Sequence, residues 1–178
     1  MRVEKWLLLI VILVGGICVL GSYGIGYQSQ PGAADILWGG VPQSIRSLYT
    51  VGMFLAAAGY FLVLYFVLFC LNSTTTRVAG KYGYSIFIII FAAILIPSAL
   101  WMPLTSLAIE QSSQLLGWLV RFVLWVVAAA SLCLLVALLT IEPRLPRLAY
   151  RLAVIGSLAF CLQTVVLDAF IWVSMFSI

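Results

Sequence analysis

Apolar residues along this chain are grouped into five long runs, separated by short polar or glycine-rich stretches. The runs cover approximately residues 5–22, 42–71, 84–107, 114–140 and 148–176. A helix needs roughly 20 apolar residues to cross the hydrocarbon core of a bilayer, and the runs have about that length or more. They lack the alternation of polar and apolar residues that a membrane β-barrel requires. The pattern predicts an all-α integral membrane bundle of five transmembrane helices in a single domain, residues 1–178.

Residues 23–41 form the one long connection between the predicted helices. This segment is rich in glycine and carries Tyr23, Tyr27 and Trp38, but its only charged residue is Asp35. A long loop with so little charge is expected to fold over the end of the bundle rather than extend into solvent. We therefore expect it to cover any site at that end.

The composition excludes several classes of function. Hydrophobic residues make up 65% of the chain and charged residues 8%, and the sequence contains no histidine. The usual ligands of haem iron and zinc are therefore missing, and the four cysteines show no Cys-x-x-Cys spacing, so we interpret them as small packing residues. We expect no metal site, no covalent cofactor and no enzymatic activity, with membrane lipids rather than nucleic acid as partners.

Positive charges predict how the chain is oriented. Seven of the nine Lys and Arg residues fall before the first helix or in the second and fourth loops: Arg2, Lys5, Arg77, Lys81, Arg144, Arg147 and Arg151. Such residues collect on the cytoplasmic or equivalent face, so the N-terminus is expected there and the C-terminus opposite, in a mitochondrial or bacterial membrane. Ile17 precedes Cys18 where a lipoprotein signal needs a small residue, so we expect the first helix to be retained.

Small residues indicate where helices approach one another closely. Gly15, Gly16 and Gly21 lie in the first helix, and residues 56–59 of the second helix read Ala-Ala-Ala-Gly. Small side chains allow membrane helices to pack with their backbones near each other. We interpret the second set as a contact inside the bundle and the first as a contact that also suits a homodimer or other subunits of a membrane complex.

A carboxylate within the fifth apolar run is the strongest sign of a site. A charged side chain near the bilayer centre costs at least about 2.5 kcal/mol, so Asp168 requires a partner. Counted from the helix ends, Arg46 and Arg121 lie at a similar depth to Asp168. We therefore predict an intramembrane ion pair of Asp168 with Arg121, Arg46 or both.

Tryptophans are concentrated in the same half of the bundle. Five of the six fall there: Trp38, Trp101, Trp118, Trp125 and Trp172. Aromatic side chains around a few polar groups are typical of a small-molecule pocket. The alternative is a belt of interfacial tryptophans with one structural ion pair.

Three motifs, in order along the chain, resemble the translocator protein or tryptophan-rich sensory protein (TspO) family. Residues 98–104 read SALWMPL, similar to the family's Asn-Ala-Leu-Trp-Ser-Pro-Leu. Residues 167–172 read LDAFIW, similar to Leu-Asn-x-x-Ile-Trp, and Phe160 occupies the aromatic position eight residues earlier. Residues 42–60 contain a Pro, a Leu-Tyr pair, a Gly-Met pair and small residues, much as the family's second helix does. The resemblance spans roughly residues 38–172.

Four positions depart from the family pattern. Ser98 and Asp168 replace two asparagines, and Ile45 replaces a tryptophan. Arg121 lies near the position of an acidic residue in the fourth helix. The ligand preference of the family is therefore not transferred to this chain.

The resemblance implies a bundle, often dimeric, that binds flat apolar molecules beneath its first loop. The expected ligand is a porphyrin or other tetrapyrrole, a sterol or a related lipid. The residues expected to contact it are Trp38, Tyr49, Trp101, Phe160, Asp168 and Trp172. The alternative is a structural accessory subunit of a larger membrane complex. A weaker alternative is a small membrane carrier protein, and it rests only on the Pro42-Gln43 pair.

Overall fold

The structure, a computed structural model, describes residues 3–28, 35 and 38–176, except for the side chains of residues 27 and 28. Within these residues five helices are long and apolar enough to cross a bilayer. They are α1 (Val3–Gln28), α3 (Gln43–Tyr65) with η1 (Phe66–Cys70), α4 (Ile86–Gln111), α5 (Gln114–Leu139), and α6 (Arg147–Cys161) with η2 (Leu162–Trp172) and α7 (Val173–Met175). The five-helix membrane bundle predicted from the apolar runs is confirmed.

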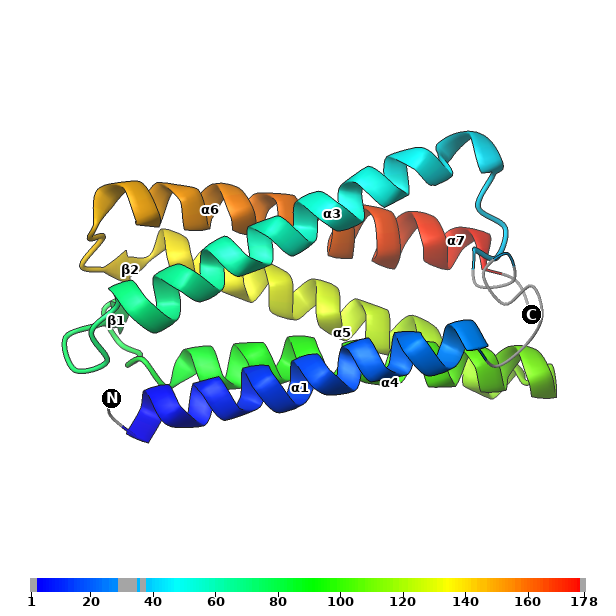
Figure 1. The fold of residues 1–178 in the computed structure, drawn as a ribbon, viewed down its shortest axis with the longest axis horizontal. Coiled ribbons are helices and arrows are strands. Elements are labelled where there is room, and N and C mark those ends of the chain that lie inside the picture. Colours follow the sequence, from blue (N-terminus) through cyan, green and yellow to red (C-terminus); the bar gives the residue numbers. More distant parts are fainter. Residues whose placement is uncertain (1–2, 29–34, 36–37, 177–178) are drawn as a thin grey trace.

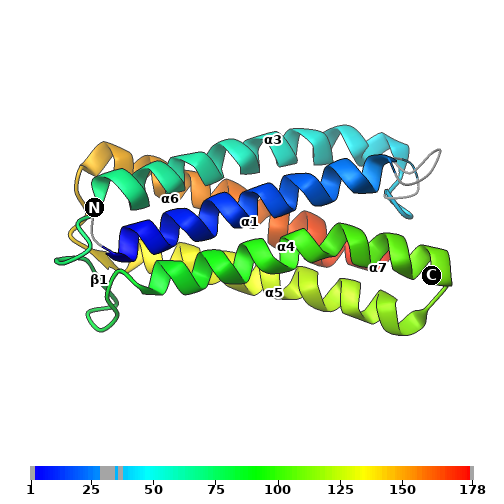
Figure 2. The ribbon, with the colours of Figure 1, turned by 60° about the horizontal axis from the view of Figure 1, so that its bottom comes forward.

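The helices form two packed layers (Figure 1). In one layer α4 packs against both α1 and α5, and in the other α3 packs along α6. The layers are joined where α5 contacts α6 and η2. Figure 2, turned about the long axis, shows α1 and α3 on the same side of the bundle. Residues from α1, α3, α4, α5 and η2 therefore surround the space between the layers.

A short sheet joins two loops at the end of the bundle that carries the N-terminus (Figure 1). Strands β1 (Arg77–Val78) and β2 (Ile141–Glu142) are antiparallel, with Arg77 opposite Glu142. They connect the loop before α4 to the loop after α5. The N-terminal end of α1 and both of these loops lie at one end of the molecule, and the C-terminal end of α7 lies at the other.

Two side chains bind backbone carbonyls at the end of the second membrane helix. Lys5 Nζ donates to the carbonyl of Leu68 at 2.7 Å, and Tyr84 Oη donates to that of Val67 at 3.1 Å. The last carbonyls of a helix have no partner within the helix itself, so outside donors are needed where the helix end is buried. These bonds attach η1 to α1 and to the segment that begins α4.

The first helix is longer than the apolar pattern predicts. It continues to Gln28, whereas the pattern ended it at residue 22. The glycines near its end suggested a loop, but a glycine inside a helix costs only about 1 kcal/mol relative to alanine. As a result Tyr23 lies on α1 and not in the connection. Most of that connection, including Pro31, lies outside the described residues.

The cysteines are not all buried as expected. Cys161 is buried and Cys70 half-buried, but Cys18 and Cys133 are exposed on the outer surface of the bundle. In a membrane helix an apolar side chain is stable against lipid as well as against protein. Apolar character alone therefore does not show which side of the helix a residue occupies.

Candidate functional site

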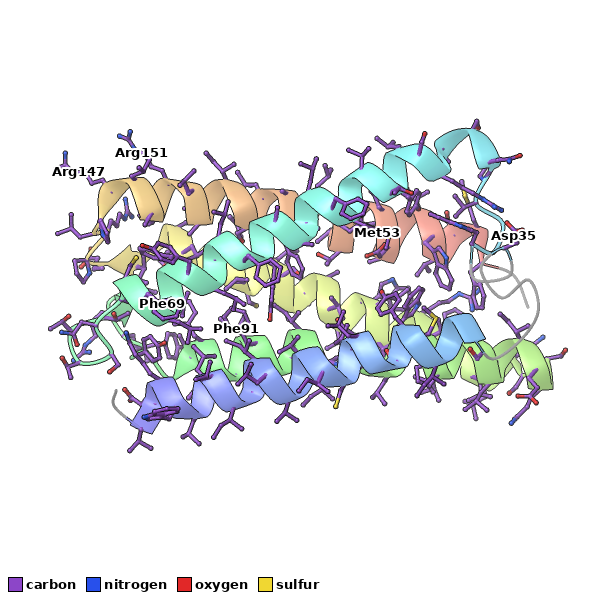
Figure 3. The ribbon with its side chains drawn as sticks, viewed as in Figure 1. Asp35, Met53, Phe69, Phe91, Arg147 and Arg151 are labelled. Atoms are coloured by element: carbon purple, nitrogen blue, oxygen red, sulfur yellow. The ribbon has the colours of Figure 1, made fainter. Side chains whose placement is uncertain are left out.

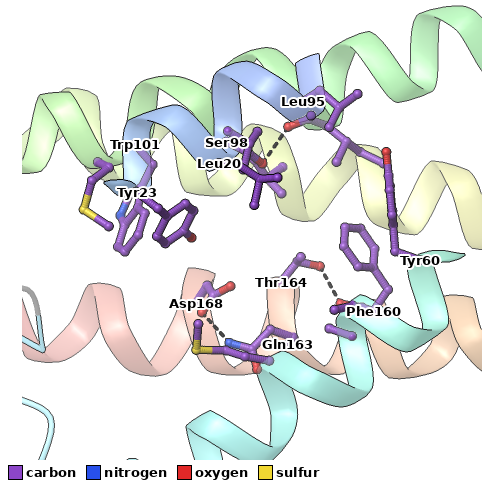
Figure 4. Close-up of a pocket in the computed structure, with 18 of the residues that line it drawn as sticks. Leu20, Tyr23, Tyr60, Leu95, Ser98, Trp101, Phe160, Gln163, Thr164 and Asp168 are labelled. Carbon is purple, nitrogen blue, oxygen red and sulfur yellow. Dashed lines mark hydrogen bonds between the residues drawn. The ribbon is translucent and has the colours of Figure 1, made fainter. Parts of the chain in front are cut away.

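A cavity of about 600 Å³ lies between the two helical layers. Its lining comes from α1, α3, α4, α5, α6 and η2, together with Trp38 from the connection between α1 and α3. Figure 3 shows that apolar side chains predominate along the whole molecule, and Figure 4 shows the interior of the cavity. The described residues around it are mainly aliphatic and aromatic, with a few polar groups on η2 and α4.

All six residues predicted to contact a ligand line this one cavity. They are Trp38, Tyr49, Trp101, Phe160, Asp168 and Trp172. They come from four different parts of the chain, so their convergence is a property of the fold. Contact between them and a ligand stays a prediction.

Aromatic rings at the end of the cavity nearest the C-terminus hold one another in place. Trp101 packs edge-on against Trp172, with 5.6 Å between ring centroids, and lies tilted against Tyr23 at 5.8 Å. Trp38 packs edge-on against Tyr49 at 5.8 Å. Such pairs add about 0.5–1.5 kcal/mol beyond the burial of their area. These ring contacts therefore hold the aromatic side chains in place at this end of the cavity.

The tryptophans divide between the two interpretations made from the sequence. Trp38, Trp101 and Trp172 line the cavity, whereas Trp118 and Trp125 do not. Trp118 is 60% exposed and Trp125 47% exposed, on the outer surface of α5. Trp125 also donates a hydrogen bond from its Nε1 to the carbonyl of Ala169 at 3.2 Å, so it links α5 to η2.

Tyr49 connects α3 to the site. Its side chain is buried, and its hydroxyl donates to the carbonyl of Leu167 at 2.8 Å. Leu167 precedes Asp168 on η2. This bond therefore holds the backbone at Asp168 against α3.

The predicted ion pair of Asp168 with Arg121 or Arg46 is wrong. Asp168 Oδ1 accepts a hydrogen bond from Gln163 Nε2 at 2.8 Å. Arg46 instead pairs with the loop residue Asp35, at 2.6 Å. Among the described residues, no arginine or lysine contacts the Asp168 carboxyl.

Arg121 binds the C-terminal segment. Its guanidinium donates to the carbonyl of Phe176 at 2.6 Å and to that of Gly117 at 3.0 Å. It also lies over the ring of Trp118, 5.4 Å from the centroid. Counting residues from a helix end gives the depth of a side chain but not the direction in which it points around the helix. A long arginine side chain can also reach toward the end of the bundle.

The pairing of Gln163 with Asp168 depends on the backbone of η2, which is a π-helix. In an α-helix, two residues five positions apart point about 140° away from each other. A π-helix has hydrogen bonds between residues i and i+5, so its wider turn brings such residues to the same side. The unusual helix therefore directs both polar groups toward the cavity.

Several residues that line the cavity were missed in the sequence. Gln163 and Thr164 of η2, Tyr60 of α3 and Tyr23 of α1 all face it (Figure 4). Gln163 and Thr164 were recognisable as polar residues inside an apolar run. Tyr23 was not, because the pattern placed it in a loop.

Three residues that line the cavity carry a buried polar atom without a hydrogen-bond partner among the described residues. They are Trp101, through its indole Nε1, Tyr60, through its hydroxyl, and Gln163, through its Oε1. A buried donor without an acceptor costs about 1–3 kcal/mol. Trp101 and Tyr60 lack an acceptor and Gln163 Oε1 lacks a donor, and all three residues line the cavity.

Comparisons of the chain with protein-family models, with curated proteins and with solved structures found no match. The resemblance to the TspO family therefore depends on the three motifs alone and stays a prediction.

Proposed function

We propose that this chain is a membrane-embedded binding protein for a flat hydrophobic ligand, which occupies the cavity between the helical layers. The ligand class is a tetrapyrrole, a sterol or a related lipid. The observation that carries the proposal is a cavity of about 600 Å³, lined by aromatic residues from α1, the connection after it, α3, α4 and the helix formed by α6 and η2. Cavities that bind small molecules typically measure about 300–1,000 Å³ and are mainly apolar.

The shape of the aromatic groups supports a flat ligand. The edge-on pairs Trp101–Trp172 and Trp38–Tyr49 fix their rings at different inclinations around one end of the cavity. At the other end Tyr60 packs against Phe160, with 5.7 Å between centroids. A ring system between these groups gains dispersion energy from planar contacts on several sides.

The polar groups of the cavity support binding rather than catalysis. Among its described lining residues are one carboxyl, one carboxamide and a few hydroxyl groups. The hydroxyls of Ser98 and Thr164 donate to carbonyls of their own helices, at 2.7 and 2.9 Å. Neither hydroxyl contacts a base that would activate it as a nucleophile.

We also propose the orientation that the positive charges predict. Arg77, Lys81, Arg144, Arg147 and Arg151 all belong to the segments at the end with β1 and β2. Positive residues are retained on the cytoplasmic or equivalent side during insertion. The end of the cavity that carries Trp38 and Trp172 then faces away from that side.

A pair of glycines on α1 provides the test of ligand binding. Gly16 lines the cavity and Gly21 does not, and a Cβ atom at either position meets nothing within 4 Å. Gly16→Phe therefore adds a ring on the cavity side of α1, at a position where its Cβ atom meets no neighbour. Gly21→Phe adds the same group to the same helix on a surface outside the cavity.

The experiment is a titration of the purified protein with the dimethyl ester of protoporphyrin IX or with a fluorescent sterol. Quenching of tryptophan fluorescence, or energy transfer to the sterol, is measured. We expect saturable binding for the unaltered protein and for Gly21→Phe, and loss of saturation for Gly16→Phe. No saturation for either probe, together with co-purification in fixed stoichiometry with other membrane proteins, would favour the accessory subunit instead.

A further inference from the structure

We propose that Asp168 makes the cavity selective for flat hydrophobic molecules that carry a positively charged nitrogen, such as a protonated amine. This inference rests on the proposed function, since it names the class of ligand within the same cavity. The carboxyl group of Asp168 is what distinguishes this cavity from a site for a purely apolar ligand.

The cavity contains a carboxyl group with no positive counterpart in the protein. Among its described lining residues, Asp168 is the only Asp or Glu, and none is a Lys or Arg. The two nearby arginines are occupied, Arg46 by Asp35 and Arg121 by the carbonyl of Phe176. A carboxylate within a membrane bundle is stable only with a partner, and an ammonium group on a ligand supplies one.

The geometry leaves one carboxyl oxygen available to a ligand. Gln163 Nε2 binds Oδ1, and no described residue donates a hydrogen bond to Oδ2. Figure 4 shows the carboxyl of Asp168 directed from η2 across the cavity, toward Tyr23 and Trp101 on the opposite side. A protonated amine at this point donates a hydrogen bond to the free oxygen.

Gln163 acts as a positioning residue for this carboxyl. Its side chain is buried against α3, where a Cβ atom at Gly52 would come within 2.5 Å of Gln163 Oε1. Glycine at position 52 therefore leaves the space that the carboxamide occupies. Held in this way, the carboxamide directs its Nε2 group toward Asp168.

Aromatic rings around the carboxyl favour the same kind of ligand. Tyr23, Trp101 and Trp172 form one cluster of rings beside Asp168. A cation near the face of an aromatic ring gains about 0.5–2 kcal/mol when water is excluded. A carboxylate and indole rings together recognise an organic cation and disfavour an anion.

The test compares two probes with the same ring system, 1-pyrenemethylamine and 1-methylpyrene, which differ by one amino group. The first is protonated at neutral pH and the second is neutral. The full chain is placed in nanodiscs of phosphatidylcholine, which has no net charge, and energy transfer from tryptophan to pyrene is measured. The signal that remains in Gly16→Phe is subtracted, because it reports probe dissolved in the lipid.

We expect the protonated probe to bind about tenfold or more tightly than the neutral one, as a charge-assisted hydrogen bond allows. Asp168→Asn should remove this preference and leave the affinity for 1-methylpyrene within about twofold. Glu110→Gln is the matched control, since it changes an exposed acid in the last turn of α4, outside the cavity, and it should keep the preference.

Each other result has a distinct meaning. Equal affinity of the unaltered protein for both probes overturns the inference and leaves the proposed function in place, and this comparison requires no variant to fold. An equal loss of affinity for both probes in Asp168→Asn also overturns the inference. Absence of saturable binding by either probe overturns the proposed function as well.

Discussion

Gly59 of α3 and Gly156 of α6 lie backbone to backbone. A Cβ atom at Gly59 would collide with the carbonyl oxygen of Gly156, and one at Gly156 would lie 2.5 Å from the carbonyl oxygen of Gly59. Only glycine at both positions permits this approach. The contact fixes α3 on α6, and so positions one side of the cavity.

Alanine at either glycine should therefore destabilise the bundle. We expect Gly59→Ala and Gly156→Ala each to lower the free energy of unfolding by about 1–3 kcal/mol, because the added methyl group has no space. Unfolding in mixed micelles with a rising fraction of SDS measures the effect. Gly21→Ala is the control, since a Cβ there meets nothing within 4 Å. Equal effects at all three positions would contradict the close contact.

Asp168 and Arg121 should behave independently. Their side chains bind different partners, Gln163 Nε2 and the carbonyl of Phe176. In a double-mutant cycle of Asp168→Asn and Arg121→Gln, we expect the losses of unfolding free energy to add within about 0.5 kcal/mol. If the double variant recovers part of the lost unfolding free energy, the two side chains interact, and the ion pair suggested by the sequence is supported.

Tyr84 should make stability depend on pH under alkaline conditions. It lies just before α4, and burial, followed by the nearby Glu4 carboxylate, raises the pKa of its phenol above the ordinary value. Above about pH 10 the unfolded chain loses this proton while the folded chain keeps it, so stability falls as pH rises.

The comparison with Tyr84→Phe isolates this effect. At neutral pH the variant should be less stable by about 1 kcal/mol, because the hydrogen bond to Val67 is lost. The difference should shrink above about pH 10, by up to about 1.4 kcal/mol per pH unit. Unfolding free energies measured across this range would refute the account if the difference stayed constant.

The proposed orientation predicts the outcome of reporter fusions. Alkaline phosphatase, which is active only outside the cytoplasm, should be active when fused after Phe176 and inactive when fused in the loop near Lys81. Replacing Arg144, Arg147 and Arg151 by glutamine should weaken this difference, because positive charge determines retention. Phosphatase activity of the Lys81 fusion, without activity of the Phe176 fusion, would show that the orientation is the opposite one.

The apolar runs predicted the five helices because the bilayer imposes a minimum length on each of them. The same reasoning failed at Tyr23, since the nearby glycines resemble a loop but are tolerated in a membrane helix. It also failed for the cysteines, since both lipid and protein accept an apolar side chain. Length is therefore readable from the sequence more reliably than the direction in which a side chain points.

Part of the cavity lining was also predictable, but its polar contacts were not. Trp101 and Trp172 were selected from their motifs, and both line the cavity. The partner of Asp168 was missed because Gln163, five residues earlier, would lie on a different face of an α-helix. Only the π-helical backbone brings the two together, and no sequence pattern used above predicts such a turn.

Photolabelling tests the central claim, that a flat hydrophobic molecule occupies the cavity, most directly. A sterol that carries a diazirine is activated in the presence of the protein, and mass spectrometry locates the modified residues. We predict labels at residues that face the cavity, such as Met53 and Tyr60, with loss of label when unmodified sterol competes or when Gly16 is replaced by Phe. Labels confined to outward-facing residues such as Phe54 and Leu148, and unaffected by competition, would contradict the account.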